Sequence, residues 1–182
     1  MDTINIMAID PGTNMGVSII SISVPDIKII GISTSSIDLS IMTKPNELQD
    51  NLLLRTQVIQ KMMREIMFMY RPRVLAMEAA FVNSRFPKSV MYLSQYIGAI
   101  SLTVTEMDPF IKIFNYPPKK VKATVSGGKA NKDDMMAAVA KITEITDCID
   151  PTKLTEHEVD SLAIGYTYLK ELRNNPVLLL MI

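Results

Sequence analysis

Apolar residues recur along the chain with two different periods, and the change from one period to the other marks the expected elements. The first part of the chain carries three short runs rich in β-branched residues, a pattern typical of strands. These runs cover residues 4–9, 16–22 and 28–32, and Asp10-Pro11-Gly12 is a turn signal after the first. The chain is therefore predicted to begin with a β-meander.

Farther along, apolar residues recur every three or four positions, which is the period of an amphipathic helix. Asn46 with Gln49, and Thr155 with Glu158, have the spacing of a capping box, and Asn131 is a third N-cap candidate. The elements predicted after the meander are a helix over about 46–70, a strand over 73–77, a helix over 90–104, a strand over 111–114, a short helix from Pro117, and helices over 131–143 and 156–172.

This order of elements is mixed α/β, and it suits a central sheet covered by helices on both faces. The 182 residues show no internal repeat and no linker-like stretch, so we expect a single domain over residues 1–182. Pro176 should end the last helix. The apolar tail, 177–182, has two open interpretations. It either docks, on the core or on a second subunit, or it frays.

Composition narrows the class of protein. With 48% apolar and 21% charged residues, the chain has the makeup of a folded globular protein. No secretory signal pattern and no run of about 18 apolar residues is present, so no membrane association and a cytoplasmic location are expected. The single cysteine, Cys148, has no partner for a disulfide or a thiolate metal site, which fits a reducing compartment.

The charges balance overall but are unevenly distributed. Nineteen basic and nineteen acidic residues give a formal net charge of zero, so bulk electrostatics do not indicate a nucleic-acid binder. The segment 109–132, however, contains no acid. Together with Tyr116 and two adjacent glycines, this segment could hold a phosphate backbone, and a solvated face is an equally good interpretation. Its lysines are Lys112, Lys119, Lys120, Lys122, Lys129 and Lys132.

Four side chains stand where a metal site could form. Asp10 and Glu78 each follow a predicted buried strand, and His157 and Asp160 lie in the first turns of the last helix. Hard divalent ions prefer oxygen ligands, and two such ions about 4 Å apart can clamp the attacking and leaving oxygens of a phosphodiester. Taken singly, each residue has an ordinary structural role, in a turn, a surface ion pair or a cap.

Helical spacing supports part of this site. His157 and Asp160 are three residues apart, on the side opposite the predicted buried stripe, so both can reach a common metal ion. Glu156 and Asp160 are four apart and could pair instead, so spacing does not choose between Glu156 and His157. The predicted buried stripe consists of Val159, Leu162, Ala163, Tyr166 and Leu169.

Four blocks of the sequence stand in order along most of the chain: AIDPGTNMGVSII from Ala8, VLAMEAAFVNSRF from Val74, PPKKVKATVSGGKANKDDM from Pro117 and HEVDSLAIGYTYL from His157. In these blocks the sequence resembles the RuvC-type Holliday junction resolvases of the RNase H-like superfamily. The resemblance implies an RNase H-like fold with a central five-stranded mixed sheet. It also implies a structure-selective DNA endonuclease that resolves Holliday junctions and related branched DNA, leaving 5′-phosphate and 3′-hydroxyl ends.

The resemblance also assigns residues and partners. Asp10, Glu78, His157 and Asp160 become the catalytic, metal-binding set for two Mg²⁺ ions, with Mn²⁺ able to substitute. Phe81 matches an aromatic residue that stacks on an unpaired base. The protein is expected to act on four-way or branched DNA as a homodimer through the helix from about 88 to 104, in a bacterial or phage-infected cell. Lys122 and Lys132 match lysines that contact DNA or stabilise phosphate. The resemblance leaves open whether Lys129 or Lys132 is the matching residue at the second position. It also makes the Lys-rich run a DNA-strand-binding surface, which consists of Lys119, Lys120, Lys122, Lys129 and Lys132.

Three other functions compete with this one. A sugar-kinase or actin-like ATPase shares the Asp-x-Gly-Thr turn, but it needs two such domains and a second phosphate loop. An RNase H-like nuclease that processes ribosomal RNA precursors shares the acidic framework, and the basic segment with Phe81 favours branched DNA over it. A catalytically silent junction-binding protein has little physical reason to gather carboxylates, because like charges repel one another without a cation.

Overall fold

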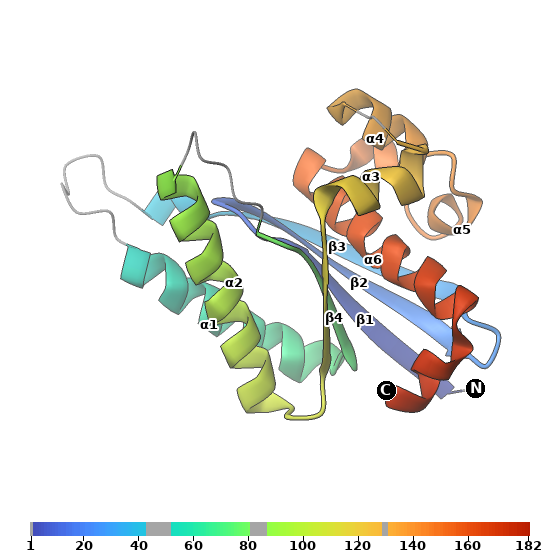
Figure 1. Ribbon diagram of the computed structural model, residues 1–182, viewed down its shortest axis with the longest axis horizontal. Coiled ribbons are helices and arrows are strands. Elements are labelled where there is room, and N and C mark those ends of the chain that lie inside the picture. The colour runs from blue at the N-terminus through green and yellow to red at the C-terminus, as the bar shows by residue number, and fades with distance from the viewer. Residues whose placement is uncertain (1, 43–51, 81–86, 129–130) are drawn as a thin grey trace.

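Five strands form one mixed sheet in the computed structural model, which describes residues 2–42, 52–80, 87–128 and 131–182. The strand order is β3-β2-β1-β4-β5 (Figure 1). β1, β2 and β3 pair antiparallel, as the predicted meander requires, whereas β4 and β5 run parallel to β1. The strands are β1 (Asp2–Asp10), β2 (Asn14–Val24), β3 (Lys28–Asp38), β4 (Val74–Glu78) and β5 (Lys112–Tyr116).

Helices cover both faces of this sheet, which confirms the predicted fold class. Two long helices lie on one face and the C-terminal helices lie on the other (Figure 1). The first group is α1 (Leu52–Tyr70) and α2 (Pro87–Met107). The second group is α3 (Pro118–Ser126), α4 (Lys132–Val139), α5 (Thr143–Thr146) and α6 (Glu156–Asn174).

Each face of the sheet has its own hydrophobic core, because successive side chains of a strand point to opposite faces. In β1, Ile6 and Ala8 pack under α6, while Met7 and Ile9 pack under α1 and α2; all four are fully buried. α6 is the most enclosed helix, since eleven of its nineteen residues are buried, including every member of the predicted stripe. A helix buried this deeply can hold polar side chains at a fixed place over the sheet.

The predicted helix over 131–143 is wrong in its extent. α4 ends at Val139, and the chain turns before α5 begins at Thr143. The break lets Ile145 enter the core, where its side chain is fully buried. The capping boxes led by Asn131, with Asp134, and by Thr155 are both present. The predicted Asn46–Gln49 box lies outside the described residues.

The apolar tail docks on the core of its own chain. After α6 ends at Asn174, residues Pro176–Met181 form a 3-10 helix, and Leu178, Leu179 and Ile182 pack against the core beneath α6. Docking is therefore the correct one of the two interpretations. Within the part of the chain that the structure describes, no helix combines the length and apolarity needed to cross a membrane.

Candidate active site

The sheet brings Asp10 and Glu78 together at one end. β1 and β4 are adjacent and parallel, and their last paired residues are Ile9 and Met77. Asp10 and Glu78 each follow by one residue, so the two side chains leave neighbouring strands at the same end and on the same face. That face is the one that α6 covers. Two predicted metal ligands far apart in sequence are thus neighbours because of strand pairing alone.

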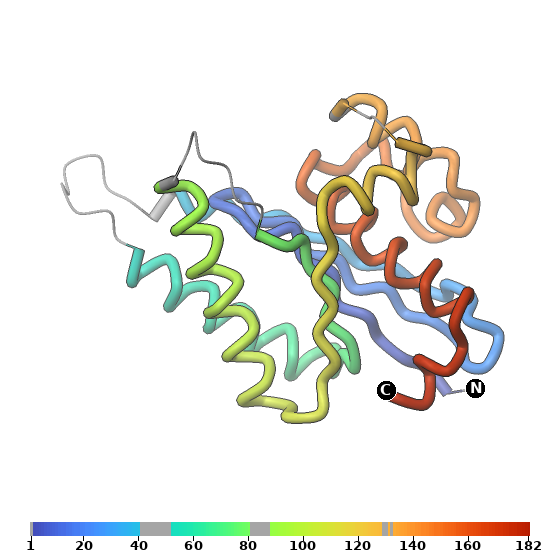
Figure 2. The backbone as a smooth tube through the Cα atoms, in the orientation of Figure 1, coloured from blue at the N-terminus to red at the C-terminus, as the bar shows by residue number. Residues whose placement is uncertain are grey.

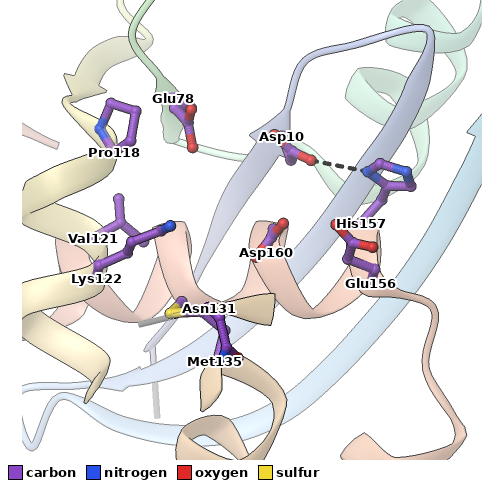
Figure 3. Close-up of a pocket in the computed structure, with 10 residues that line it drawn as sticks. All are labelled: Asp10, Glu78, Pro118, Val121, Lys122, Asn131, Met135, Glu156, His157 and Asp160. Atoms are coloured by element: carbon purple, nitrogen blue, oxygen red, sulfur yellow. Dashed lines mark hydrogen bonds and ion pairs between the residues drawn. The ribbon is translucent and has the colours of Figure 1, made fainter. Parts of the chain in front are cut away.

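The first turns of α6 complete the cluster. The Nδ1 atom of His157 lies 3.2 Å from Oδ2 of Asp10, and both side chains are mostly buried. With a proton on Nδ1 the imidazole donates to Asp10, which leaves Nε2 to accept a proton or bind a metal ion. Asp160 faces the same space one turn later (Figure 3). Spacing left Glu156 and His157 as alternatives, and the structure places both side chains at the same pocket, with His157 in contact with Asp10.

All four predicted residues line one pocket of about 320 Å³. In Figure 3, Asp10, Glu78 and Asp160 point into a common space, and the amine of Lys122 reaches towards it from α3. The pocket lies between the sheet end, α3, α4 and α6. Its lining residues are Asp10, Glu78, Pro118, Val121, Lys122, Asn131, Met135, Glu156, His157 and Asp160.

Burial, with a smaller contribution from the neighbouring carboxylates, makes both strand-end residues weaker acids. Burial raises the pKa of Asp10 to about 6, and the charge of Asp160 adds to that rise, while the contact with His157 opposes it. Burial likewise raises the pKa of Glu78 to about 7, with Asp10 and Asp160 adding and Lys122 opposing. Weak acids gathered in one cleft are typical of functional sites, because their negative charge is stabilised only when a cation or proton neutralises it.

These pKa values predict that the contribution of Asp10 and Glu78 to the stability of the metal-free protein falls as the pH rises from about 4 to 7. The folded state keeps protons on Asp10 and Glu78 above the pH at which the unfolded state releases them, so the penalty is absent at low pH and complete above the folded-state pKa. We expect a loss on the order of 3 kcal/mol after allowance for solvent screening. Urea unfolding in EDTA at several pH values measures this loss as a change in the free energy of unfolding. A contribution of these two groups to the free energy of unfolding that rises with pH over this range would contradict the prediction.

The donor set fits a hard divalent cation. The imidazole of His157 and four carboxylates line the pocket, those of the predicted Asp10, Glu78 and Asp160 and that of Glu156, and oxygen-rich sets of this kind suit Mg²⁺ and Mn²⁺. Among the described residues, no three His, Cys, Asp or Glu side chains are already arranged to hold an ion. Ionised carboxylates repel one another until a cation neutralises them, so Asp10, Glu78 and Asp160 would have to turn towards a cation within the space they share.

The predicted DNA-binding lysines take different positions. Lys122 lines the pocket, and Lys119 is exposed on α3. Lys120 instead forms an ion pair with Glu171 of α6 and lies over the ring of Tyr116, with Nζ 5.0 Å from the ring centroid. Three of the predicted DNA contacts cannot be placed: Phe81 and Lys129 lie outside the described residues, and the side chain of Lys132 is not described.

Sequence reasoning missed several residues that shape the site. Tyr116 donates a hydrogen bond of 2.5 Å to Glu171, which joins β5 to α6 and, through Lys120, to α3. Asn131 and Met135 form the wall contributed by α4. Helical periodicity marked Asn131 as a cap but carried no sign that the start of α4 faces the pocket, since that placement depends on how α4 packs against α6.

The predicted dimer helix, α2, has its apolar stripe inside the subunit. Ile97, Ile100 and Val104 belong to the core beneath α1 and α2. The outer side of the helix is also partly apolar, because Met91 and Leu102 are 48% and 55% exposed. A contact between two copies of the chain would use this outer side.

Comparisons with known proteins agree with the geometry. A family model described as "Crossover junction endodeoxyribonuclease RuvC" matches residues 6–168. Proteins of the same name from Campylobacter hominis and Campylobacter concisus are 31% and 32% identical to this chain. The alignments cover 92% and 93% of the chain, and 97% and 99% of the two relatives.

Solved structures confirm the fold. Thermus thermophilus RuvC in complex with a Holliday junction substrate superposes with a TM-score of 0.71 at 22% identity, covering 94% of this chain and 96% of that one. The yeast mitochondrial Holliday junction resolvase Ydc2 gives a TM-score of 0.63 at 17% identity, covering 93% and 81%. Both similarities extend across the sheet and the helices on its two faces.

Proposed function

Because the chain belongs to the RuvC family of crossover junction endodeoxyribonucleases, we propose that it is a metal-dependent endonuclease that resolves Holliday junctions. We assign this activity to one nuclease domain formed by residues 1–182. The single observation that carries the proposal is the convergence of Asp10, Glu78, His157 and Asp160 on one pocket, within a chain that matches the family over nearly its whole length.

Each residue has a separate task in the proposed site. The carboxylates of Asp10, Glu78 and Asp160 hold Mg²⁺, with Mn²⁺ able to substitute and two ions per site. His157, oriented by Asp10, adds a nitrogen ligand or accepts a proton at Nε2. A bound divalent ion polarises a phosphodiester oxygen and lowers the pKa of a water molecule, which together favour hydrolysis. Lys122 places a positive charge beside the pocket, where it can attract the scissile phosphate.

Substrate recognition is proposed to extend along α3 and into the Lys-rich run. Lys119 and Lys122 belong to one short helix at the rim of the pocket, so one DNA strand can contact both. Phe81, Lys129 and Lys132 remain proposed contacts from the resemblance. Two symmetric incisions require two active sites, so we propose a homodimer, with the outer side of α2 as its contact surface.

Cleavage of a cruciform plasmid tests the activity and the dimer together. In Mg²⁺ the protein should convert the supercoiled plasmid directly to a linear form, because a dimer makes paired incisions in one binding event. Asp160→Asn should lower the rate by roughly 100-fold or more, since it removes a charged oxygen ligand. Asp147→Asn, which changes an exposed carboxylate at the end of α5, is the matched control and should cut like the wild type.

Other outcomes point to the competing functions. Junction binding without cleavage in Mg²⁺ or Mn²⁺ would leave a binding protein. Cleavage of structured RNA alone would identify a processing nuclease for ribosomal RNA precursors. Accumulation of singly nicked circles, with no linear form, would contradict the paired action of a dimer.

A further inference from the structure

One face of β2 touches α6 at three regularly spaced points. Gly16, Ser18 and Ile20 alternate along the strand, so their side-chain positions lie on the same face. They oppose residues of α6 that are four apart: His157, Ser161 and Gly165. Figure 2 shows α6, the red-orange helix, running along the strands at the blue N-terminal part of the chain. Its first turn carries His157, which contacts Asp10.

The two outer points are close approaches at glycine positions, and at Gly16 the neighbouring atom belongs to backbone that cannot move aside. A Cβ atom on Gly16 would lie 1.8 Å from the carbonyl oxygen of His157, so the strand and helix backbones are in direct contact there. A Cβ atom on Gly165 would lie 2.6 Å from Cδ1 of Ile20. These approaches set the depth at which α6 lies on the sheet, but van der Waals contact alone has little directional preference.

The middle point is a directional contact. The hydroxyl oxygens of Ser18 and Ser161 lie 2.5 Å apart, and both side chains are fully buried. Ser161 donates its single hydroxyl hydrogen to the carbonyl oxygen of Glu158, 2.8 Å away. Ser18 must therefore be the donor to Ser161, and this bond fixes where one turn of α6 stands along β2.

The spacing of the three points suits a fixed register. Two residues of a strand advance about 6.7 Å, and four residues of a helix advance about 6 Å, so the contacts stay nearly in step over two repeats. Ser161 directly follows Asp160, and Ser18 pairs across the sheet with Ala8, two residues before Asp10. The serine contact is thus next to Asp160 along the chain and next to the Asp10 end of β1 through strand pairing.

We propose that Ser18 and Ser161 are positioning residues for the active site: their hydrogen bond fixes α6 on β2 and so sets the distance of His157 and Asp160 from Asp10. The inference rests on the proposed function. Neither serine lines the pocket, so each acts through the elements that carry the ligands and not on the substrate. Groups that hydrogen-bond directly to metal ligands change metal affinity by about 10-fold to 100-fold when they are removed. The serine pair acts on His157 and Asp160 through the backbone of α6.

Metal binding by three variants and a control tests the proposal without requiring activity. Mn²⁺ titration by calorimetry should show at least a tenfold higher Kd for Ser161→Ala, because that change also leaves the buried Ser18 donor without an acceptor. Ser18→Ala should have a smaller effect, since Ser161 keeps its bond to Glu158. The double variant should be no worse than Ser161→Ala, so the two effects should not add.

Thr167→Val is the matched control. Thr167 is also buried in α6 and donates within the helix, to the carbonyl oxygen of Ala163 at 2.8 Å. It lies beyond the three contact points with β2, so its removal should leave Mn²⁺ affinity within about twofold of the wild type. Junction binding in EDTA should stay unchanged in all four variants, which separates metal positioning from DNA contact.

A second readout follows the position of the imidazole directly. His157 is the only histidine in the chain, so its ring signals in a ¹H–¹³C spectrum are unambiguous. At fixed pH in EDTA, these signals should shift in Ser18→Ala and Ser161→Ala and stay in place in Thr167→Val. If Ser161→Ala does not fold, the ring signals of His157 in Ser18→Ala test the proposal.

Unchanged ring signals together with unchanged Mn²⁺ affinity in a folded serine variant would overturn the proposal. That result differs from a failure of the proposed function, in which the wild type itself would not cut junction DNA with any metal. A wild type that cuts, beside serine variants that bind Mn²⁺ equally well, would leave the nuclease intact and remove only the positioning role.

Discussion

Replacing Asp10 with asparagine is expected to abolish junction cleavage while leaving the protein folded and able to bind DNA. Asp10 lies beside His157, and its charge acts on Glu78 as that of Asp160 acts on Asp10. The amide keeps the size of the side chain but removes the negative charge, so the cleavage rate should fall by roughly 1000-fold or more. Single-turnover cleavage of an end-labelled junction measures the loss, and gel shift in EDTA should show junction affinity within about threefold of the wild type.

The same substitution should make the metal-free protein more stable at pH 8. Wild-type Asp10 must be ionised there although its pKa is raised to about 6, and the neutral amide removes that penalty. At pH 4, where the carboxyl group is protonated, the difference should disappear. Asp26→Asn is the control, because Asp26 is exposed in the turn between β2 and β3, at the far end of the strands. Full cleavage by Asp10→Asn would exclude Asp10 from the reaction.

Replacing Gly16 with alanine should disturb both the fold and the site. The added methyl group would meet the carbonyl oxygen of His157 at 1.8 Å, and this oxygen belongs to backbone that cannot rotate away. Either α6 shifts outward or β2 bends, at a cost of about 3 kcal/mol in the free energy of unfolding. Because the first turn of α6 carries His157 and Asp160, cleavage should fall even at temperatures where the variant is fully folded.

Gly98 offers a matched control for this change. It lies on an exposed part of α2, and an added Cβ atom there would meet nothing within 4 Å. Gly98→Ala should therefore raise the free energy of unfolding by about 1 kcal/mol through helix propensity. Urea denaturation compares the stability of both variants, and junction cleavage is compared between Gly16→Ala and the wild type, because Gly98 lies on the side of α2 proposed as the dimer contact surface. A Gly16→Ala protein with wild-type stability and cleavage would show that β2 and α6 are not in backbone contact.

Short-range patterns predicted most of the elements. Strand and helix periods, turn residues and the Thr155 and Asn131 caps depend on neighbours in the sequence, and the structure contains those elements. The errors occurred where packing opposed local preference. Periodicity predicted a helix that continues to residue 143. In the structure α4 ends at Val139, and the break allows the side chain of Ile145 to be fully buried in the core.

The candidate site was predictable for a different reason. Asp10 and Glu78 were recognisable because each follows a buried strand, and parallel neighbouring strands end at the same edge of a sheet. The sequence did not show which lysines of the Lys-rich run lie at the pocket and which form ion pairs elsewhere. Lys120 and Lys122 are two residues apart in one helix, yet Lys120 pairs with Glu171 while Lys122 lines the pocket. Only the packing of α3 against α6 distinguishes them.

The sequence by itself determined the α/β order, the covered sheet, the family resemblance and the four residues of the candidate site. All of these depend on residue identity and spacing along the chain. The tertiary structure decided how closely α6 approaches β2, which nitrogen of His157 faces Asp10, and the pairing of Ser18 with Ser161. These contacts join segments more than 140 positions apart, and their geometry depends on strand pairing and helix packing, which no local pattern encodes.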